Sequence, residues 1–205
     1  MVLEESCSVM SGNAITAGRQ QERTLSRIGR KPIPLPSGVQ VEVGYGEVTV
    51  KGPMGTLTQT YHPEVEVRVD DGEVLVERLS TKKFHHALHG LTRSLIANAI
   101  TGVDQGYTKT LELMGVGYRV QQADDGIILF VGYSHPVEIH PPEGVTMEVE
   151  GNNRVHVRGT DKQKVGNLAA QVRKVRRPNA YKEKGIRYQG EILRFKPGKA
   201  AARKA

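Results

Sequence analysis

Three closely spaced histidines, His85, His86 and His89, are the residues of this chain whose types and spacing best suit metal chemistry. In a helix, His85 and His89 would share a face one turn apart, as two zinc ligands do. A zinc protease needs a glutamate directly after the first histidine, and His86 stands there instead, with no third ligand evident. Helical arithmetic places the three histidines with Lys82 and Arg93 on one polar face. The pattern therefore predicts a solvent-facing helix surface and no metal site.

Two other motifs resemble a cofactor-binding loop and part of a catalytic triad, but neither is complete. Gly115-Val-Gly117 begins like a dinucleotide-binding loop, but Val120 holds the position of the third glycine, and no G-K-[ST] phosphate loop is present. Ser134 and His135 are adjacent, and neighbouring residues of a strand point to opposite faces, so they cannot form part of a catalytic triad. The sequence predicts no enzyme, no cofactor and no small-molecule substrate.

The positive charge is concentrated near the C-terminus. The 205 residues carry a formal net charge of +7, yet residues 154–205 alone hold 16 basic and 3 acidic residues, against 13 and 19 in the first 153. Cations packed so densely repel one another unless a polyanion neutralises them, which favours a nucleic-acid partner. A membrane surface is the weaker alternative, because the chain has no Trp and no hydrophobic anchor beside the basic residues.

Composition sets further bounds. The longest uninterrupted apolar run, Ile127–Val131, is far shorter than the roughly 18 residues of a membrane span. Cys7 is the single cysteine, which excludes an intramolecular disulfide framework and a CxxC zinc site.

Lysines and arginines follow one another at short intervals from residue 173 onward, with tyrosines among them. Cations in the last turn of a helix favour its dipole, which gives a structural reason for some of them. The others lie on a turn-rich segment after Pro178, suited to contacting the phosphates of folded RNA and to stacking on an unpaired base. The predicted RNA-binding residues are Arg173, Lys174, Arg176, Arg177, Tyr181, Lys182, Lys184, Arg187, Arg194, Lys196 and Lys199.

The elements that must position these residues repeat along the chain. Alternating hydrophobicity predicts strands at 39–43, 48–51, 65–69 and 74–77, and then at 108–113, 118–121, 127–131, 137–140, 145–149 and 155–158. Gly52-Pro-Met-Gly55 has the GXXG spacing of a KH RNA-binding loop, but in this strand-rich stretch it predicts a hairpin turn.

Each set of strands is followed by a helix. The first begins at Ser80 or Thr81 and ends at Gly102. The second is capped by Asp161 and ends before Pro178. The predicted buried faces are Phe84, Ala87, Leu88, Leu91 and Leu95 in the first helix, and Val165, Leu168, Ala169, Val172 and Val175 in the second.

Strand, turn, strand, cap and helix thus recur at an offset of about 80 residues. This duplication predicts an α+β protein of two small domains, 26–106 and 107–192, each an antiparallel sheet covered by one main helix. Residues 1–25 and the basic stretch 193–205 predict flexible tails, because neither has a core-building pattern.

Several motifs in order resemble one family: Ser26-Arg-Ile-Gly-Arg-Lys-Pro-Ile33, Lys51-Gly-Pro-Met-Gly55, Gly115-Val-Gly-Tyr-Arg119, Gly132-Tyr-Ser-His-Pro-Val137 and the segment 178–188. Residues 26–199 are similar to the bacterial-type ribosomal protein L-six family of the large subunit. The resemblance implies two duplicated α+β domains and binding of large-subunit rRNA beside the sarcin–ricin region and the stalk base, where translational GTPases dock. It further implies neighbouring large-subunit proteins as partners, transient proximity to elongation factors, and a cytoplasmic rather than an organellar ribosome.

The sequence departs from the family in its basic segment and at its start. Glu183 stands where the family usually has Gly or Ala, and residues 1–25 have no counterpart. Two interpretations of this stretch stay open: a flexible extension, or a translation start at Leu25, where the family has its first methionine. The alternative function is a free-standing RNA-binding regulatory protein, which would not co-sediment with large subunits in stoichiometric amounts.

Overall fold

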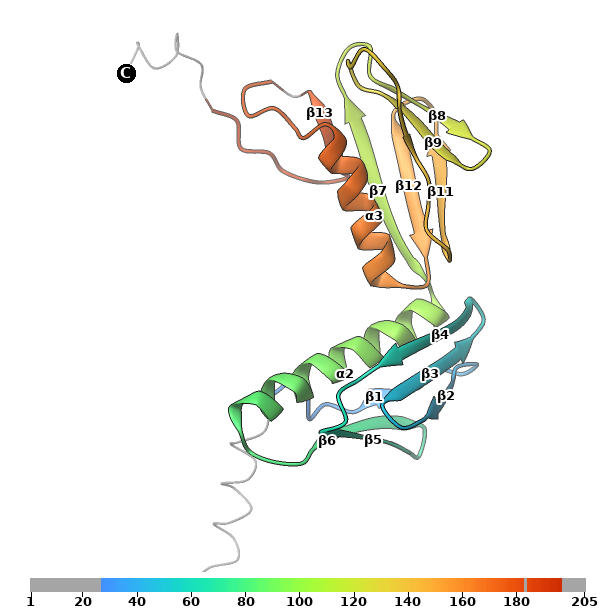
Figure 1. Cartoon of the computed structure of the whole chain (residues 1–205), viewed down its shortest axis with the longest axis vertical. Coiled ribbons are helices and arrows are strands. Elements are labelled where there is room, and N and C mark those ends of the chain that lie inside the picture. Colours follow the sequence, from blue (N-terminus) through green and yellow to red (C-terminus); the bar gives the residue numbers. More distant parts are fainter. Residues whose placement is uncertain (1–26, 183, 197–205) are drawn as a thin grey trace, which may run out of the picture. The chain divides into compact units, whose positions relative to one another are not determined.

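The computed structural model describes residues 27–182 and 184–196 (Figure 1). The predictions for residues 1–25, Glu183 and Lys199 therefore lie outside the described residues. The described chain forms two compact units by its own contacts. The first holds 27–35, 43–48 and 60–97; the second holds 36–42, 49–59 and 98–196.

The N-terminal half consists of short antiparallel strands and one long helix, α2 (Lys83–Asp104). Its strands are β1 (Ile33–Pro34), β2 (Gln40–Val43), β3 (Glu47–Gly52), β4 (Gly55–Thr60), β5 (Val65–Asp70) and β6 (Glu73–Arg78). They form two three-stranded sheets of order β1-β6-β5 and β2-β3-β4. The predicted hairpin turn is confirmed, because Gly52 ends β3 and Gly55 begins β4.

The face of α2 that is buried differs from the predicted one. Phe84, Ala87 and Leu91, all predicted to be buried, are exposed, Leu91 to 55%. The placement of the histidines on the outer face is also wrong for His85 and His89, which are buried, His89 to 2% exposure. The buried positions of α2 are His85, His89, Thr92, Ile96, Ala99, Ile100, Gly102 and Val103.

The apolar residues in the C-terminal half of α2 decide which face of the helix is buried. A period of 3.6 carries the buried face from Ile96 back through His89 to His85. Each buried histidine has a polar partner for one ring nitrogen: His89 Nε2 donates to the Val76 carbonyl of β6 at 2.8 Å, and His85 Nε2 lies 2.9 Å from the Glu64 carboxylate. The other nitrogen of His89, Nδ1, is buried without a hydrogen-bond partner among the described residues. The polarity of histidine favours the surface in a sequence pattern, but a hydrogen bond allows its burial in α2.

The C-terminal half has a larger sheet, a smaller sheet and the helix α3 (Lys162–Val175). Its strands are β7 (Tyr107–Met114), β8 (Arg119–Ala123), β9 (Gly126–Phe130), β10 (Val137–Ile139), β11 (Val145–Glu150), β12 (Arg154–Gly159) and β13 (Gly185–Tyr188). The antiparallel sheets have the orders β11-β12-β7-β13 and β10-β9-β8. The predicted α+β fold, with antiparallel sheets and one main helix in each half, is confirmed. The predicted boundary between residues 106 and 107 stays a prediction.

The helix α3 matches its prediction closely. The Asp161 carboxylate accepts a hydrogen bond from the Gln163 amide at 2.7 Å, which caps the helix. The helix packs against β7, β12 and β13, as Figure 1 shows. Its apolar face is buried in one core with residues of both sheets, among them Val165, Leu168, Ala169, Val172, Leu111, Val155 and Ile186.

The segment after α3 is more regular than predicted. The sequence predicts a turn-rich segment, but Gly185–Tyr188 is strand β13, which pairs antiparallel with β7. Pairing with the edge of β7 buries Ile186 completely. The strand was missed because four residues are too few to show a period, so the available strand edge decides the conformation. Within the described residues no helix is both long and apolar enough to cross a membrane.

Candidate nucleic-acid interface

The loop between α3 and β13 is closed by backbone hydrogen bonds. The Ile186 amide donates to the Arg176 carbonyl at 2.8 Å, and the Asn179 amide donates to the Lys184 carbonyl at 2.9 Å. The Lys196 amide donates to the Ala180 carbonyl at 2.8 Å, which ties the following segment to the same loop. These bonds give a cation-rich loop a defined shape.

This loop and the end of α3 surround a cavity of about 510 Å³. Five of its lining residues are basic and none of the described lining residues is acidic. We call this set the basic cavity; it consists of Lys174, Arg176, Arg177, Lys182 and Lys184, with Tyr118, Tyr133, Val175 and Asn179. The structure thus brings five of the predicted RNA-binding residues together.

Two tyrosines from distant turns hold one of these cations. The Arg176 guanidinium lies 5.0 Å above the centroid of the Tyr133 ring, and the Tyr133 hydroxyl donates to the Val175 carbonyl at 2.8 Å. A hydrogen bond with Tyr133 raises the pKa of Arg176 above its ordinary value, and one with Tyr118 adds a smaller effect in the same direction. Arg176 is therefore a fixed cation whose position depends on the tyrosines.

Arg173 and Arg187, two other predicted RNA-binding residues, are paired with carboxylates. Arg173 donates to both Glu191 oxygens, at 2.5 Å from Nη2 and 3.2 Å from Nε. Its guanidinium lowers the pKa of Glu191, chiefly through that hydrogen bond. Arg187 on β13 donates to the half-buried Glu112 on β7, with Nη2 at 3.3 Å. Arg173 thus ties Glu191 to α3, and Arg187 ties β13 to β7.

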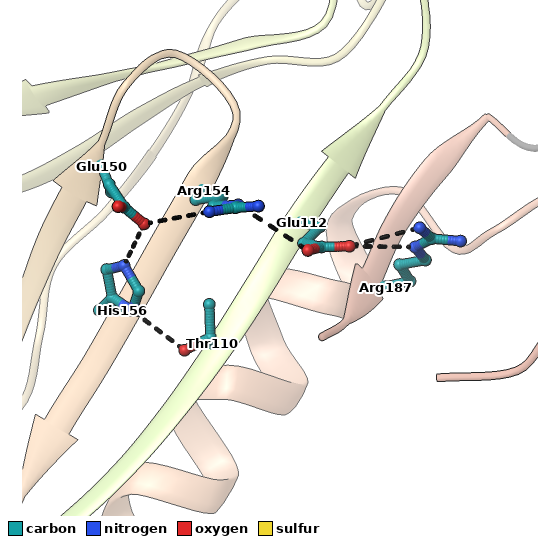
Figure 2. Close-up of polar contacts among 6 residues, drawn as sticks. All are labelled: Thr110, Glu112, Glu150, Arg154, His156 and Arg187. Carbon is teal, nitrogen blue, oxygen red and sulfur yellow. Dashed lines mark hydrogen bonds and ion pairs between the residues drawn. The ribbon is translucent and has the colours of Figure 1, made fainter. Parts of the chain in front are cut away.

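The Arg187 pair belongs to a larger polar network on one face of the four-stranded sheet, shown in Figure 2. Arg154 on β12 lies between Glu112 and Glu150, at 3.8 Å and 3.6 Å. His156 bridges Glu150, at 3.0 Å, and the Thr110 hydroxyl, also at 3.0 Å. The His156 hydrogen bond is the main cause of the lowered pKa of Glu150. Because cations and carboxylates alternate here, this face offers no comparable excess of positive charge.

The remaining predicted residues lie around the loop. Tyr181 is 62% exposed, and Arg194 and Lys196 are exposed as well. Among the described residues, no carboxylate lies within ion-pair distance of Arg194 or Lys196. The described residues also contain no group of three His, Cys, Asp or Glu placed to hold a metal ion.

Sequence reasoning missed the role of Tyr118 and Tyr133 in this site. Both belong to motifs quoted for the family resemblance, Gly115–Arg119 and Gly132–Val137, and that was the available signal. Nothing in the local sequence places these turns beside residues 174–184.

Comparison with known proteins agrees with the motifs. The family profile "Ribosomal protein L6" matches residues 35–106 and 114–189. The "Large ribosomal subunit protein uL6" of Caldicellulosiruptor bescii is 56% identical over 176 residues, covering 86% of this chain and 97% of that protein. The protein of the same name from Thermus thermophilus is 56% identical over 180 residues, covering 88% of this chain and 100% of that protein.

These matches place the chain among the ribosomal proteins, a class of structural, non-enzymatic proteins. The chain belongs to the ribosomal protein L6 family. The resemblance drawn from the sequence motifs is thus confirmed, and so is the prediction that the protein is not an enzyme.

Proposed function

We propose that this protein is a structural constituent of the large ribosomal subunit that binds large-subunit rRNA through the basic cavity. The RNA site is the sarcin–ricin region and stalk base that the family resemblance implied, so the protein supports the docking of translational GTPases. Its partners are neighbouring large-subunit proteins and, transiently, elongation factors, in the cytoplasm. The observation that carries the proposal is the clustering of five cations around one cavity without a described acidic residue.

The geometry suits phosphate contacts. The cations come from the end of α3 and from a loop closed by its own hydrogen bonds, so they are held close together before RNA arrives. Backbone phosphates supply most of the affinity of such interfaces and position the protein on the RNA. Arg173 and Arg187 act in this proposal as supports, because each is engaged by a carboxylate.

Salt dependence of rRNA binding tests the cavity. Five neutralised phosphates give a slope of log affinity against log salt of about −4 to −5, taking ~0.9 per contact. Neutralising Lys182 and Lys184 together as glutamines should reduce the magnitude of the slope by about 1–2. The matched control is Lys162→Gln with Lys164→Gln, which removes the same charge from the first turn of α3 and should leave the slope unchanged. Equal slopes in both double variants would contradict the proposal.

Sedimentation tests the ribosomal role against the free-standing regulator. The protein should co-sediment with large subunits at one copy per subunit. Recovery of most of the protein in the free fraction, at a salt concentration where subunits stay intact, would favour the regulator.

A further inference from the structure

A second cavity, of about 540 Å³, adjoins the basic cavity. Tyr118 and Tyr133 line both cavities, which makes these tyrosines the shared wall. We call the second cavity the aromatic groove. It is lined by Gly117, Tyr118, Arg119, Phe130, Gly132, Tyr133, Ser134, His135, Pro136 and Asn152. Phosphate binding in the basic cavity gives the other eight of these residues no role.

The chemistry of the aromatic groove differs from that of the basic cavity. It contains one cation, Arg119, whose guanidinium lies 4.5 Å above the centroid of the Phe130 ring. The exposed His135 ring is nearly parallel to that of Tyr133, with an interplanar angle of 18° and centroids 6.3 Å apart. Flat aromatic and guanidinium surfaces of this kind are what unpaired RNA bases stack on. Asn152 adds a side chain able to read the edge of a base.

The turns that build the groove hold its shared wall in place. Gly115 and Gly132 have φ values of +142° and +75°, which favour glycine. Both pack on Tyr118: a Cβ atom would lie 3.3 Å from the Tyr118 Cγ at Gly115 and 3.5 Å from its Cε1 at Gly132. The Tyr118 ring is thus fitted against two glycine turns, so the groove is formed before RNA binds.

We propose that the aromatic groove binds one unpaired nucleobase of the rRNA while the phosphates beside that nucleotide lie in the basic cavity. This inference rests on the proposed function and extends it from phosphate contact to recognition of a splayed-out nucleotide. The five adjacent cations favour a nucleotide over a neutral apolar ligand. An acidic peptide carrying an aromatic side chain is the competing occupant, and the experiment separates the two.

The test uses the full-length protein and purified bacterial large-subunit rRNA. His135→Ala removes an exposed ring from the groove, and His140→Ala removes an exposed histidine that lies outside it. We expect His135→Ala to weaken rRNA binding by about 5- to 150-fold, the range of one lost base stack, with an unchanged salt slope. A base that the wild-type protein protects from dimethyl sulfate or carbodiimide should become reactive. His140→Ala should match the wild type in both measurements.

Each other result overturns the inference. It is wrong if His135→Ala binds rRNA as tightly as the wild type, or if affinity falls while every base stays protected. It is also wrong if base reactivity is unaffected and His135→Ala instead abolishes binding of a Glu–Tyr copolymer, since the occupant is then a peptide. If one of these results is found and the Lys182 and Lys184 double variant still has a reduced salt slope, only the base-binding inference is wrong and the proposed function stands. An unchanged slope there refutes the proposed function itself.

Discussion

Gly185, which begins β13, packs closely against the backbone at the start of the loop that lines the basic cavity. Its φ of +144° is one that side-chain-bearing residues rarely adopt. A Cβ atom would lie 2.5 Å from the Pro178 Cα and 2.8 Å from the Arg177 carbonyl oxygen, and both neighbours are backbone atoms that cannot rotate away. Gly185→Ala therefore forces apart the two ends of the loop.

The two penalties can be estimated separately. Unfavourable backbone conformation costs about 1–3 kcal/mol, and overpacking a close contact costs a similar amount. Together they lower the free energy of unfolding of Gly185→Ala by about 2–6 kcal/mol and its Tm by about 4–24 °C. Because the loop also loses its closing bonds to Arg176 and Asn179, rRNA affinity should fall even at temperatures where the variant is folded.

Gly190→Ala is the matched control. Its φ of +77° is also unfavourable for alanine, but no atom lies within 4 Å of the added Cβ position. It should cost about 1 kcal/mol, from backbone conformation alone. Urea unfolding of the two variants measures the difference. Equal destabilisation by Gly185→Ala and Gly190→Ala would refute the steric part of the reasoning.

Two further predictions concern the helix α2 and an ion pair. Leu91→Gln on the exposed face should change the free energy of unfolding by less than about 0.5 kcal/mol, whereas Ile96→Ala should lower it by about 2–5 kcal/mol in urea unfolding. The reverse order would mean that the face with Leu91 is the buried one. Because Arg173 lowers the pKa of Glu191, that carboxylate stabilises the fold above its ordinary pKa of 4.5, and this contribution is lost as pH falls through the lower folded value. Glu191→Gln should therefore be less stable than the wild type at neutral pH and lose less stability between about pH 5 and about pH 3, and parallel pH profiles would contradict this.

Much of this protein is fixed by local sequence. Alternation and turn residues predict most strands, and Asp161 with the apolar face of α3 predicts that helix, because caps and periodicity act within a few residues. The excess of basic residues from residue 154 onward predicts the polyanionic partner, since net charge does not depend on the fold. The order of the motifs identifies the family.

Other features depend on contacts between distant segments. Periodicity gives α2 two faces, but packing against β6 decides that the face with His89 is buried, through the hydrogen bond to Val76. Strand β13 exists because β7 offers an edge to residues 185–188. Neither partner can be inferred from a short sequence window.

The candidate site shows the same division. The basic residues are visible in the sequence as a cluster, yet only the tertiary structure shows that Arg187 is engaged by Glu112, 75 positions away in the chain. It likewise places Tyr118 and Tyr133 beside the end of α3. Residue types and their order fix charge and periodicity, but which cation has a carboxylate partner depends on distances that folding alone sets.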